Sequence, residues 1–296
     1  MPKILVASLA MSDAGKTTTA RAAIRALKSQ GMEVCPFKPA GEIWLYKDWT
    51  YVARALKEGR FYGQDAHLLR QDAEVPFPEE TLNPAFRLVS PARHDQEGEY
   101  CPTVMARCTV GSDPLEHVIA LDRKRIAKLG LERDIEKLTS AKEVTVVEFS
   151  SLADLNRMVG EYLQGSIVQA HRTITARYDN IVYESAGFSA MPWIGLKDLD
   201  YVIGVNHGYL QLYDGPLYRK NFSLTHEVTV DSNWAKDHES REHALWRNFS
   251  LIRTAQVVAR QKPIAEVQVP PLLSGMIDAG FGDAVMRLLR SAGAIM

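Results

Sequence analysis

The amino-acid sequence predicts an α/β fold in which helices cover both faces of a mostly parallel central sheet. The apolar run 4–9 indicates a buried strand, and the stretch 19–27 has the pattern of a helix. A second strand-like run, 33–37, follows that helix, and two parallel strands joined by a helix form a right-handed βαβ unit. The 296 residues fit one large α/β domain or two small ones, and 46% hydrophobic residues suffice for a packed core.

The stretch 10–18, between the first strand and the first helix, has the features of a phosphate-binding loop. Backbone N–H groups at such a loop and at the start of the next helix attract an anion. Lys16 would reach the terminal phosphates of a nucleotide, and Thr17 would place its hydroxyl on Mg²⁺. Gly15 is present where backbone and phosphate approach closest, although Ala10 replaces the usual first glycine. The residues expected to bind the nucleotide are Ser12, Asp13, Ala14, Gly15, Lys16, Thr17 and Thr18.

These assignments have plain alternatives. A Gly-Lys-Thr sequence also occurs by chance at ordinary helix starts, but the strand before it and the helix after it favour phosphate binding. Lys38 follows the second strand, and because ligands gather at the carboxyl ends of parallel strands, we expect it near Lys16. The alternative for Lys38 is a surface lysine. Asp65 lies at the start of a short predicted helix, where its ordinary role is an N-cap.

Composition narrows the class of protein. A net charge of −1, from 35 basic and 36 acidic residues, argues against a nucleic-acid or membrane-surface partner. The three cysteines, Cys35, Cys101 and Cys108, are odd in number and sparse, which favours a reducing compartment. Cys101 and Cys108 lack the spacing of zinc ligands, which favours buried or inert thiols. No apolar run has the length of a membrane span, and the first strand leaves no room for a signal peptide. We therefore expect a cytoplasmic protein.

The rest of the chain continues the alternation of helices and strands. Buried strands are predicted at 181–183 and 201–205, and the strand 181–183 ends at Glu184. The other expected elements are a loop entering a helix at 44–63, an ordered proline-rich loop at 75–91, a charged helical stretch at 113–138, strands at 143–149, 228–230 and 264–269, and helices at 152–163, 165–176, 251–260 and 281–292.

Five short segments occur in a characteristic order. They are Ser-Asp-Ala-Gly-Lys-Thr at 12–17, Phe-Lys-Pro at 37–39, Gln-Asp-Ala at 64–66, Asn-Pro-Ala-Phe at 83–86 followed by Ser90-Pro91, and Ile-Val-Tyr-Glu-Ser-Ala-Gly at 181–187. Together they resemble the dethiobiotin synthetase family of P-loop ATP-dependent enzymes and its relatives, the cobyric acid and cobyrinate amide synthases. The resemblance implies a three-layer P-loop NTPase fold, here a single domain over 1–296. Relative to the family, residues 95–150 form an insertion that we expect to be a cap or a dimer surface.

The resemblance also implies a chemistry. ATP would be the nucleotide, Thr17, Asp65 and Glu184 would hold Mg²⁺, and Lys16 and Lys38 would be the catalytic lysines. The γ-phosphate would pass to a carboxylate or carbamate of a small anionic substrate, which nitrogen then attacks to form a C–N bond. Ser12 would contact this substrate, and Asn206 or Asn233 would recognise the base. A homodimer is the expected assembly.

Two features keep other functions open. Glu42 lies where the family carries Ser or Thr, and its charge would repel an anionic substrate. A nucleotide-driven switch acting through protein partners is one alternative, although such switches often carry a lysine where this chain has Met11. A regulatory nucleotide sensor without turnover is another.

Overall fold

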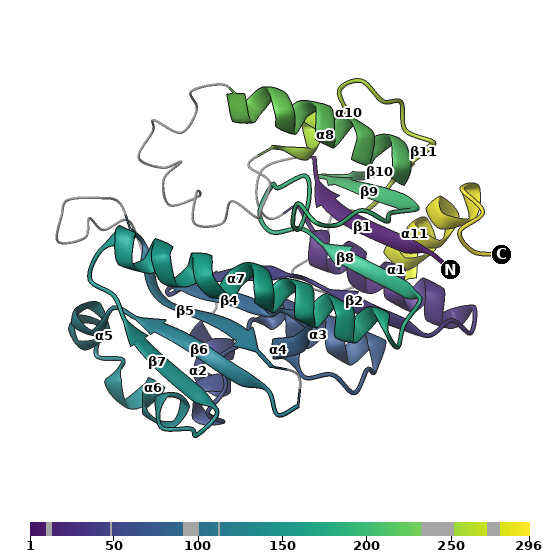
Figure 1. Cartoon of the computed structure of the whole chain (residues 1–296). Helices are drawn as coiled ribbons and strands as arrows, with labels where there is room; N and C mark the ends of the chain where they lie inside the picture. Colours follow the sequence, from purple (N-terminus) through teal and green to yellow (C-terminus); the bar gives the residue numbers. More distant parts are fainter. Residues whose placement is uncertain (10–13, 48, 91–100, 112, 232–251, 271–278) are drawn as a thin grey trace.

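The computed structural model describes residues 1–9, 14–47, 49–90, 101–111, 113–231, 252–270 and 279–296, which form two β-sheets with helices on both sides (Figure 1). The α/β class predicted from the sequence is therefore confirmed. The first sheet has the strand order β11-β10-β9-β1-β8-β2. Its strands are β1 (Lys3–Ser8), β2 (Val34–Phe37), β8 (Asn180–Glu184), β9 (Tyr201–Asn206), β10 (Tyr209–Asp214) and β11 (Ala265–Gln268).

The expectation of a mostly parallel sheet is confirmed only in part. Strands β9, β1, β8 and β2 run parallel, and β1, in the centre, is almost entirely buried, as a strand covered on both faces must be. Strands β10 and β11 are antiparallel additions at one edge. Only His207 and Gly208 connect β9 to β10, and so short a connection allows a hairpin but no crossover to a parallel strand. Gly208 has a φ of 82°, which suits that turn.

The second sheet was not predicted. Its strand order is β3-β4-β5-β6-β7, and only the outer pairs β3–β4 and β6–β7 are parallel. The strands are β3 (Ala40–Trp44), β4 (Ala85–Val89), β5 (Thr103–Val110), β6 (Glu116–Leu121) and β7 (Val144–Glu148). The described part of the expected insertion at 95–150 thus supplies three strands to a sheet that β3 and β4 begin. Its role as a cap or dimer surface stays a prediction.

Helices cover both sheets (Figure 1). They are α1 (Lys16–Ser29), α2 (Trp49–Lys57), α3 (Gln64–Ala73), α4 (Glu79–Leu82), α5 (Arg123–Leu129), α6 (Glu132–Thr139), α7 (Leu152–Thr175), α8 (Gly215–Asp231), α10 (Thr254–Val258) and α11 (Ala279–Ser291). Helices α1 and α11 lie on one side of the first sheet, and α8 and α10 lie on the other. Helix α7 packs on β4, β5 and β6, and its buried residues share one core with the first sheet.

Four predicted elements need correction. The stretch 113–138 contains β6 as well as two short helices, because the apolar residues of β6 pair with a strand on each side, β5 and β7. Gly165 does not break α7, since it lies on the exposed side of a helix whose buried stripe continues past it. Residues 228–230 belong to α8 and form no strand. The proline-rich loop at 75–91 contains α4 and β4.

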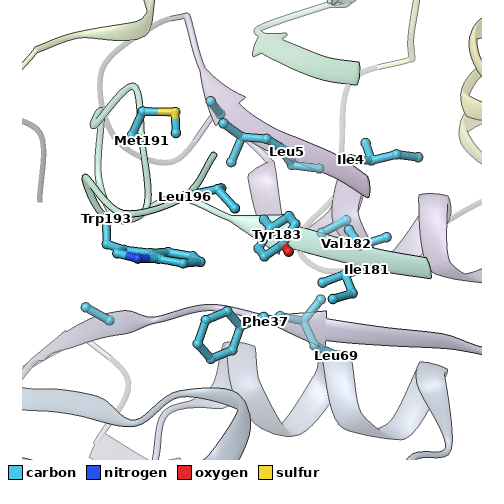
Figure 2. Close-up of a cluster of buried hydrophobic side chains, with 14 of the residues drawn as sticks. Ile4, Leu5, Phe37, Leu69, Ile181, Val182, Tyr183, Met191, Trp193 and Leu196 are labelled. Carbon is cyan, nitrogen blue, oxygen red and sulfur yellow. The ribbon is translucent and has the colours of Figure 1, made fainter. Parts of the chain in front are cut away.

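An aromatic cluster joins the strands of the first sheet beneath their carboxyl ends. Figure 2 shows Phe37 of β2 and Tyr183 of β8 with Trp193 from the loop that follows β8. The centroid of the Phe37 ring lies 6.3 Å from that of the Tyr183 ring and 5.7 Å from that of the Trp193 ring. Phe37 and Tyr183 are also partners in the parallel register. The cluster therefore fixes the carboxyl ends of two strands, next to Lys38, which follows β2, and Glu184, which ends β8.

Candidate functional site

The loop between β1 and α1 requires the glycine that the sequence places there. Gly15 has φ 92° and ψ 24°, a left-handed conformation that strains other residues, and it precedes Lys16, the first residue of α1. Thr19 fixes the turn by donating its hydroxyl to the Gly15 carbonyl at 3.0 Å. Ala14, Thr18 and the Lys16 side chain are buried. Ser12 and Asp13 lie outside the described residues, so their expected contacts stay predictions.

Glu184 lies beside the start of α1 because its strand pairs with β1. The parallel register places Val6 opposite Glu184, and the Ser185 N–H donates to the Val6 carbonyl at 3.1 Å. The Thr17 hydroxyl donates to Glu184 Oε1 at 2.9 Å. Two residues that are 167 positions apart in the chain thus meet at the carboxyl edge of the sheet, as the topology predicts.

Lys38 meets the same carboxylate from the other neighbouring strand. It follows β2, and its Nζ donates to Glu184 Oε1 at 2.6 Å and also to the Asp65 carboxylate. Lys38 and Glu184 are 7% and 1% exposed, whereas the Asp65 side chain is 44% exposed. The alternative of a surface lysine is therefore wrong.

Asp65 reaches this cluster from the first turn of α3. The N-cap of α3 is Gly63, without a side-chain cap, so the alternative of Asp65 as an N-cap is wrong. A Cβ on Gly63 would come within 2.7 Å of the buried Phe86 ring, which explains the glycine. Because Gly63 packs closely against Phe86, the first turn of α3 lies where Asp65 faces Lys38.

The electrostatics of the three charged groups are coupled. Burial alone would lower the pKa of Lys38, but the Asp65 and Glu184 carboxylates outweigh it and raise that pKa. Burial would raise the pKa of Asp65, yet the Lys38 ammonium holds it below its ordinary value. Burial does raise the pKa of Glu184, and the nearby Asp65 charge adds to the effect. The cluster holds one lysine charge between two carboxylates that differ in their affinity for a proton.

Glu184 has one carboxylate oxygen for which the described residues provide no hydrogen-bond partner. Its Oε2 is buried and accepts no hydrogen bond from the described residues, and the Ser185 hydroxyl next to it also lacks one. Buried polar atoms are satisfied in most structures, so an orphaned carboxylate oxygen suggests a ligand such as a cation or its water. Mg²⁺ prefers hydroxyl and carboxylate oxygens, and the Thr17 hydroxyl is already bonded to this carboxylate.

The sequence did not predict the hydrogen bonds that link Lys16 and Lys38 to neighbouring loops through backbone groups. Lys16 donates to the Gly187 carbonyl at 2.5 Å, which ties the loop after β8 to the start of α1. The Lys38 N–H donates to the Leu82 carbonyl at 2.9 Å, and Asn83 Nδ2 donates to the Lys38 carbonyl at 2.7 Å. Asn83 was noted only because it belongs to a segment that resembles the family, and that resemblance does not predict its bond to Lys38.

Glu42 differs from its expected role. It pairs across the strands with Arg87, which donates from Nε at 3.0 Å and is largely buried. The sequence predicted that Glu42 would repel an anionic substrate, but it gave no sign of Arg87. The Arg87 guanidinium compensates the negative charge of Glu42. Asn206 bonds within its own hairpin, accepting the His207 N–H at 2.8 Å, and Asn233 lies outside the described residues. Base recognition by either asparagine stays a prediction.

Comparisons with known proteins do not assign a family. No family model matches the chain, and no curated protein matches it. Among solved structures, the chain is similar to a crystal structure of HopZ1a in complex with IP6 and CoA. That similarity has 11% identity and a TM-score of 0.18, over 97% of this chain and 88% of that chain, and it carries no argument about fold or function.

Three further expectations bear on the site and its surroundings. Cys101 and Cys108 are buried, as predicted, and so is Cys35; none of the three is in a disulfide. Within the described ranges, none of the helices combines the length and apolar character that crossing a bilayer would need. The same ranges contain no group of three or more His, Cys, Asp or Glu side chains placed to hold a metal. That finding leaves the predicted Mg²⁺ set open, since Thr17 contributes a hydroxyl.

Proposed function

We propose that this chain has a P-loop NTPase fold and is an ATP- and Mg²⁺-dependent enzyme. It would transfer the γ-phosphoryl group of ATP to a carboxylate or carbamate of a small anionic substrate, preparing that carbon for attack by nitrogen. One observation carries the proposal. Glu184 Oε1 accepts hydrogen bonds from both Thr17 and Lys38, at 2.9 Å and 2.6 Å, at the carboxyl edge of three parallel strands.

The residues present fit Mg²⁺. Thr17, Asp65 and Glu184 supply hard oxygen atoms, and the buried Glu184 Oε2 has no other partner among the described residues. A Mg²⁺ held by these residues would supply positive charge that offsets the charge of the phosphates. A cation of this kind keeps several water ligands, so few protein ligands suffice.

The two lysines have separate tasks in this proposal. Lys16, in the first turn of α1, lies where the helix dipole and the backbone N–H groups attract phosphate. Lys38 is held by two carboxylates and by backbone bonds on both sides, so its ammonium is fixed before the reaction. Fixed positive charge beside the transferred phosphoryl group is the main source of catalysis in such reactions, because positioning and electrostatics dominate.

The proposal predicts that ADP forms only when a suitable acid is present. Protein, ATP and Mg²⁺ would be incubated with a panel of small carboxylic and carbamic acids in the presence of hydroxylamine. An acyl phosphate reacts with hydroxylamine to give a hydroxamate and inorganic phosphate, so ADP and hydroxamate should appear in equal amounts. The readouts are ADP by coupled assay and hydroxamate by its iron complex.

Other outcomes would favour the alternatives. ADP release that no acid stimulates, together with ATP-dependent dimerisation in light scattering, would favour a nucleotide-driven switch. Tight ATP binding with no ADP formed over hours would favour a regulatory sensor. Either result would overturn the phosphoryl-transfer proposal while leaving the nucleotide site in place.

A further inference from the structure

A cluster of charged side chains that the proposed reaction does not use lies where α4 packs against α3 (Figure 1). Its centre is the one-turn helix α4, whose first two residues, Glu79 and Glu80, are only 1% and 3% exposed. Arg60, from the segment between α2 and α3, donates to both carboxylates, at 2.6 Å to Glu79 Oε2 and at 3.0 Å to Glu80 Oε1. Two adjacent carboxylates are costly to bury in so short a helix, and this cost calls for an explanation.

Glu79 differs from Glu80 in what it reaches. Its Oε1 lies 3.0 Å from His67 Nδ1 and 3.5 Å from a guanidinium nitrogen of Arg70, and both residues belong to α3. Burial would raise the pKa of Glu79, but the hydrogen bonds from His67 and Arg60 outweigh it and hold that pKa below its ordinary value. An ionised carboxylate only accepts hydrogen bonds, so His67 Nδ1 is the donor. Glu79 thus ties α3 to α4, whereas the described residues bond Glu80 to Arg60 alone.

The two helices that Glu79 ties together also hold Lys38. The first turn of α3 carries Asp65, whose carboxylate accepts from the Lys38 ammonium. The end of α4 holds the Lys38 backbone, because the Leu82 carbonyl accepts its N–H at 2.9 Å and Asn83 donates to its carbonyl at 2.7 Å. The contacts therefore form a closed ring, which runs from Lys38 through Asp65 and α3 to Glu79 and returns through α4.

We propose that Glu79 is a positioning residue, which ties α3 to α4 and so holds Asp65 and Lys38 in the mutual geometry that phosphoryl transfer needs. A buried ion network adds little stability compared with apolar packing, so the main effect of this one is to fix the groups that it joins. A misplacement of about 1 Å can cost about a hundredfold in rate. The kinetic consequence rests on the proposed function, whereas the geometric role of Glu79 does not.

The test compares Glu79→Met with Glu80→Met in the full chain. Methionine is similar in length to glutamate but has no acceptor oxygen, so each variant removes one buried carboxylate from α4 and leaves the other to Arg60. The cations left behind in the first variant can be solvated, since the side chains of Arg60, His67 and Arg70 are 32%, 22% and 39% exposed. Only Glu79→Met breaks the tie between α3 and α4, so Glu80→Met is the matched control for lost charge and packing.

Amide hydrogen exchange, followed by NMR, gives a readout that needs no substrate. The Lys38 N–H reports on its bond to α4, and the His67 N–H reports on the first turn of α3 through its bond to the N-cap carbonyl. Both amides should exchange about tenfold faster or more in Glu79→Met than in Glu80→Met, as expected when a buried hydrogen bond to a charged group is lost. Equal exchange in the two variants would overturn the positioning role.

Kinetics would show whether this geometry serves the reaction. In Glu79→Met, kcat for acid-dependent ADP formation should fall about ten- to a hundredfold while the KM for ATP changes less than about twofold, because the nucleotide is expected to bind at the start of α1. Glu80→Met should change neither value by more than about twofold. Equal losses of kcat in both variants would contradict the proposal. If the wild-type protein forms no ADP with any acid, the proposed function fails, and hydrogen exchange still decides the role of Glu79.

His67→Phe tests the other end of the same bond, should Glu79→Met fail to fold. A phenyl ring can keep the stacking on Tyr62, whose ring centroid lies 6.0 Å from that of His67, but it cannot donate to Glu79. The Lys38 amide should again exchange faster than in the wild-type protein, because one of the bonds between α3 and α4 is gone. An unchanged exchange rate at Lys38 in this variant would count against the tie.

Discussion

Replacing Lys16 by alanine is expected to lower acid-dependent ADP formation by about 10²–10³-fold, the loss typical of a removed charge-stabilising group. Lys16 opens α1 directly after the left-handed Gly15, so it is in the turn of this helix where phosphate is expected to bind. Binding of an ATP analogue should weaken as well. Steady-state kinetics and calorimetric titration would give the two effects.

The matched control for Lys16 lies at the other end of the same helix. Lys28, in the last turn of α1, pairs with Glu74 at 2.7 Å and bonds to two backbone carbonyls. Lys28→Ala should change ADP formation less than twofold while costing a little stability. Full turnover in Lys16→Ala would show that phosphate does not bind at this helix start.

Replacing Lys38 by methionine is expected to destabilise the protein by about 3 kcal/mol at pH 7. Removing one member of a buried ion pair typically costs 3–5 kcal/mol, because the remaining charge is uncompensated. Here Glu184 is 1% exposed and would lose its cation, whereas the half-exposed Asp65 can be solvated. Urea unfolding followed by circular dichroism would measure the loss.

The pH dependence separates this mechanism from simple loss of packing. Burial already raises the pKa of Glu184, and without Lys38 it would rise further, so the variant can neutralise Glu184 by binding a proton. A group whose pKa is raised on folding stabilises at low pH and loses this contribution as the pH rises through its folded-state pKa. The deficit of Lys38→Met should therefore be smaller at pH 5 than at pH 7.

A double variant supplies the control. Lys38→Met combined with Glu184→Gln removes the uncompensated charge and should recover a large part of the stability lost in Lys38→Met, although it cannot restore activity. A deficit that is equal at both pH values and unchanged in the double variant would mean that Lys38 acts through packing alone.

The convergence of the lysine cluster could be anticipated because it follows from local patterns and one topological rule. Lys38 and Glu184 each end a strand that the apolar runs predict, and parallel strands bring their carboxyl ends to one edge. Asp65 was placed by the family resemblance and not by periodicity. The roles of these residues toward ATP and Mg²⁺ remain predictions.

Of the second sheet only the strand at 143–149 was anticipated, because β3 pairs with β4 and β6 pairs with β7 across long stretches of chain that local patterns do not connect. The strand β5, Thr103–Val110, carries Arg107 in its middle, a residue that argues against a central strand until its buried carbonyl partners are known. Its guanidinium is fully buried and bonds to the carbonyls of Phe61 and Asn83. The Glu42–Arg87 pair could not be predicted either, because β3 and β4, which carry the two residues, lie about forty residues apart in the sequence.

In the proposed function, Thr17, Lys38, Asp65 and Glu184 surround one metal–triphosphate complex. Its most direct test is a crystal grown with Mn²⁺ and a non-hydrolysable ATP analogue, with the metal located by its anomalous signal. We expect one Mn²⁺ ion bonded to the Thr17 hydroxyl and to the phosphates, with the Asp65 and Glu184 carboxylates bonded to it directly or through water. A triphosphate bound away from Lys16, or a metal remote from Glu184, would contradict it.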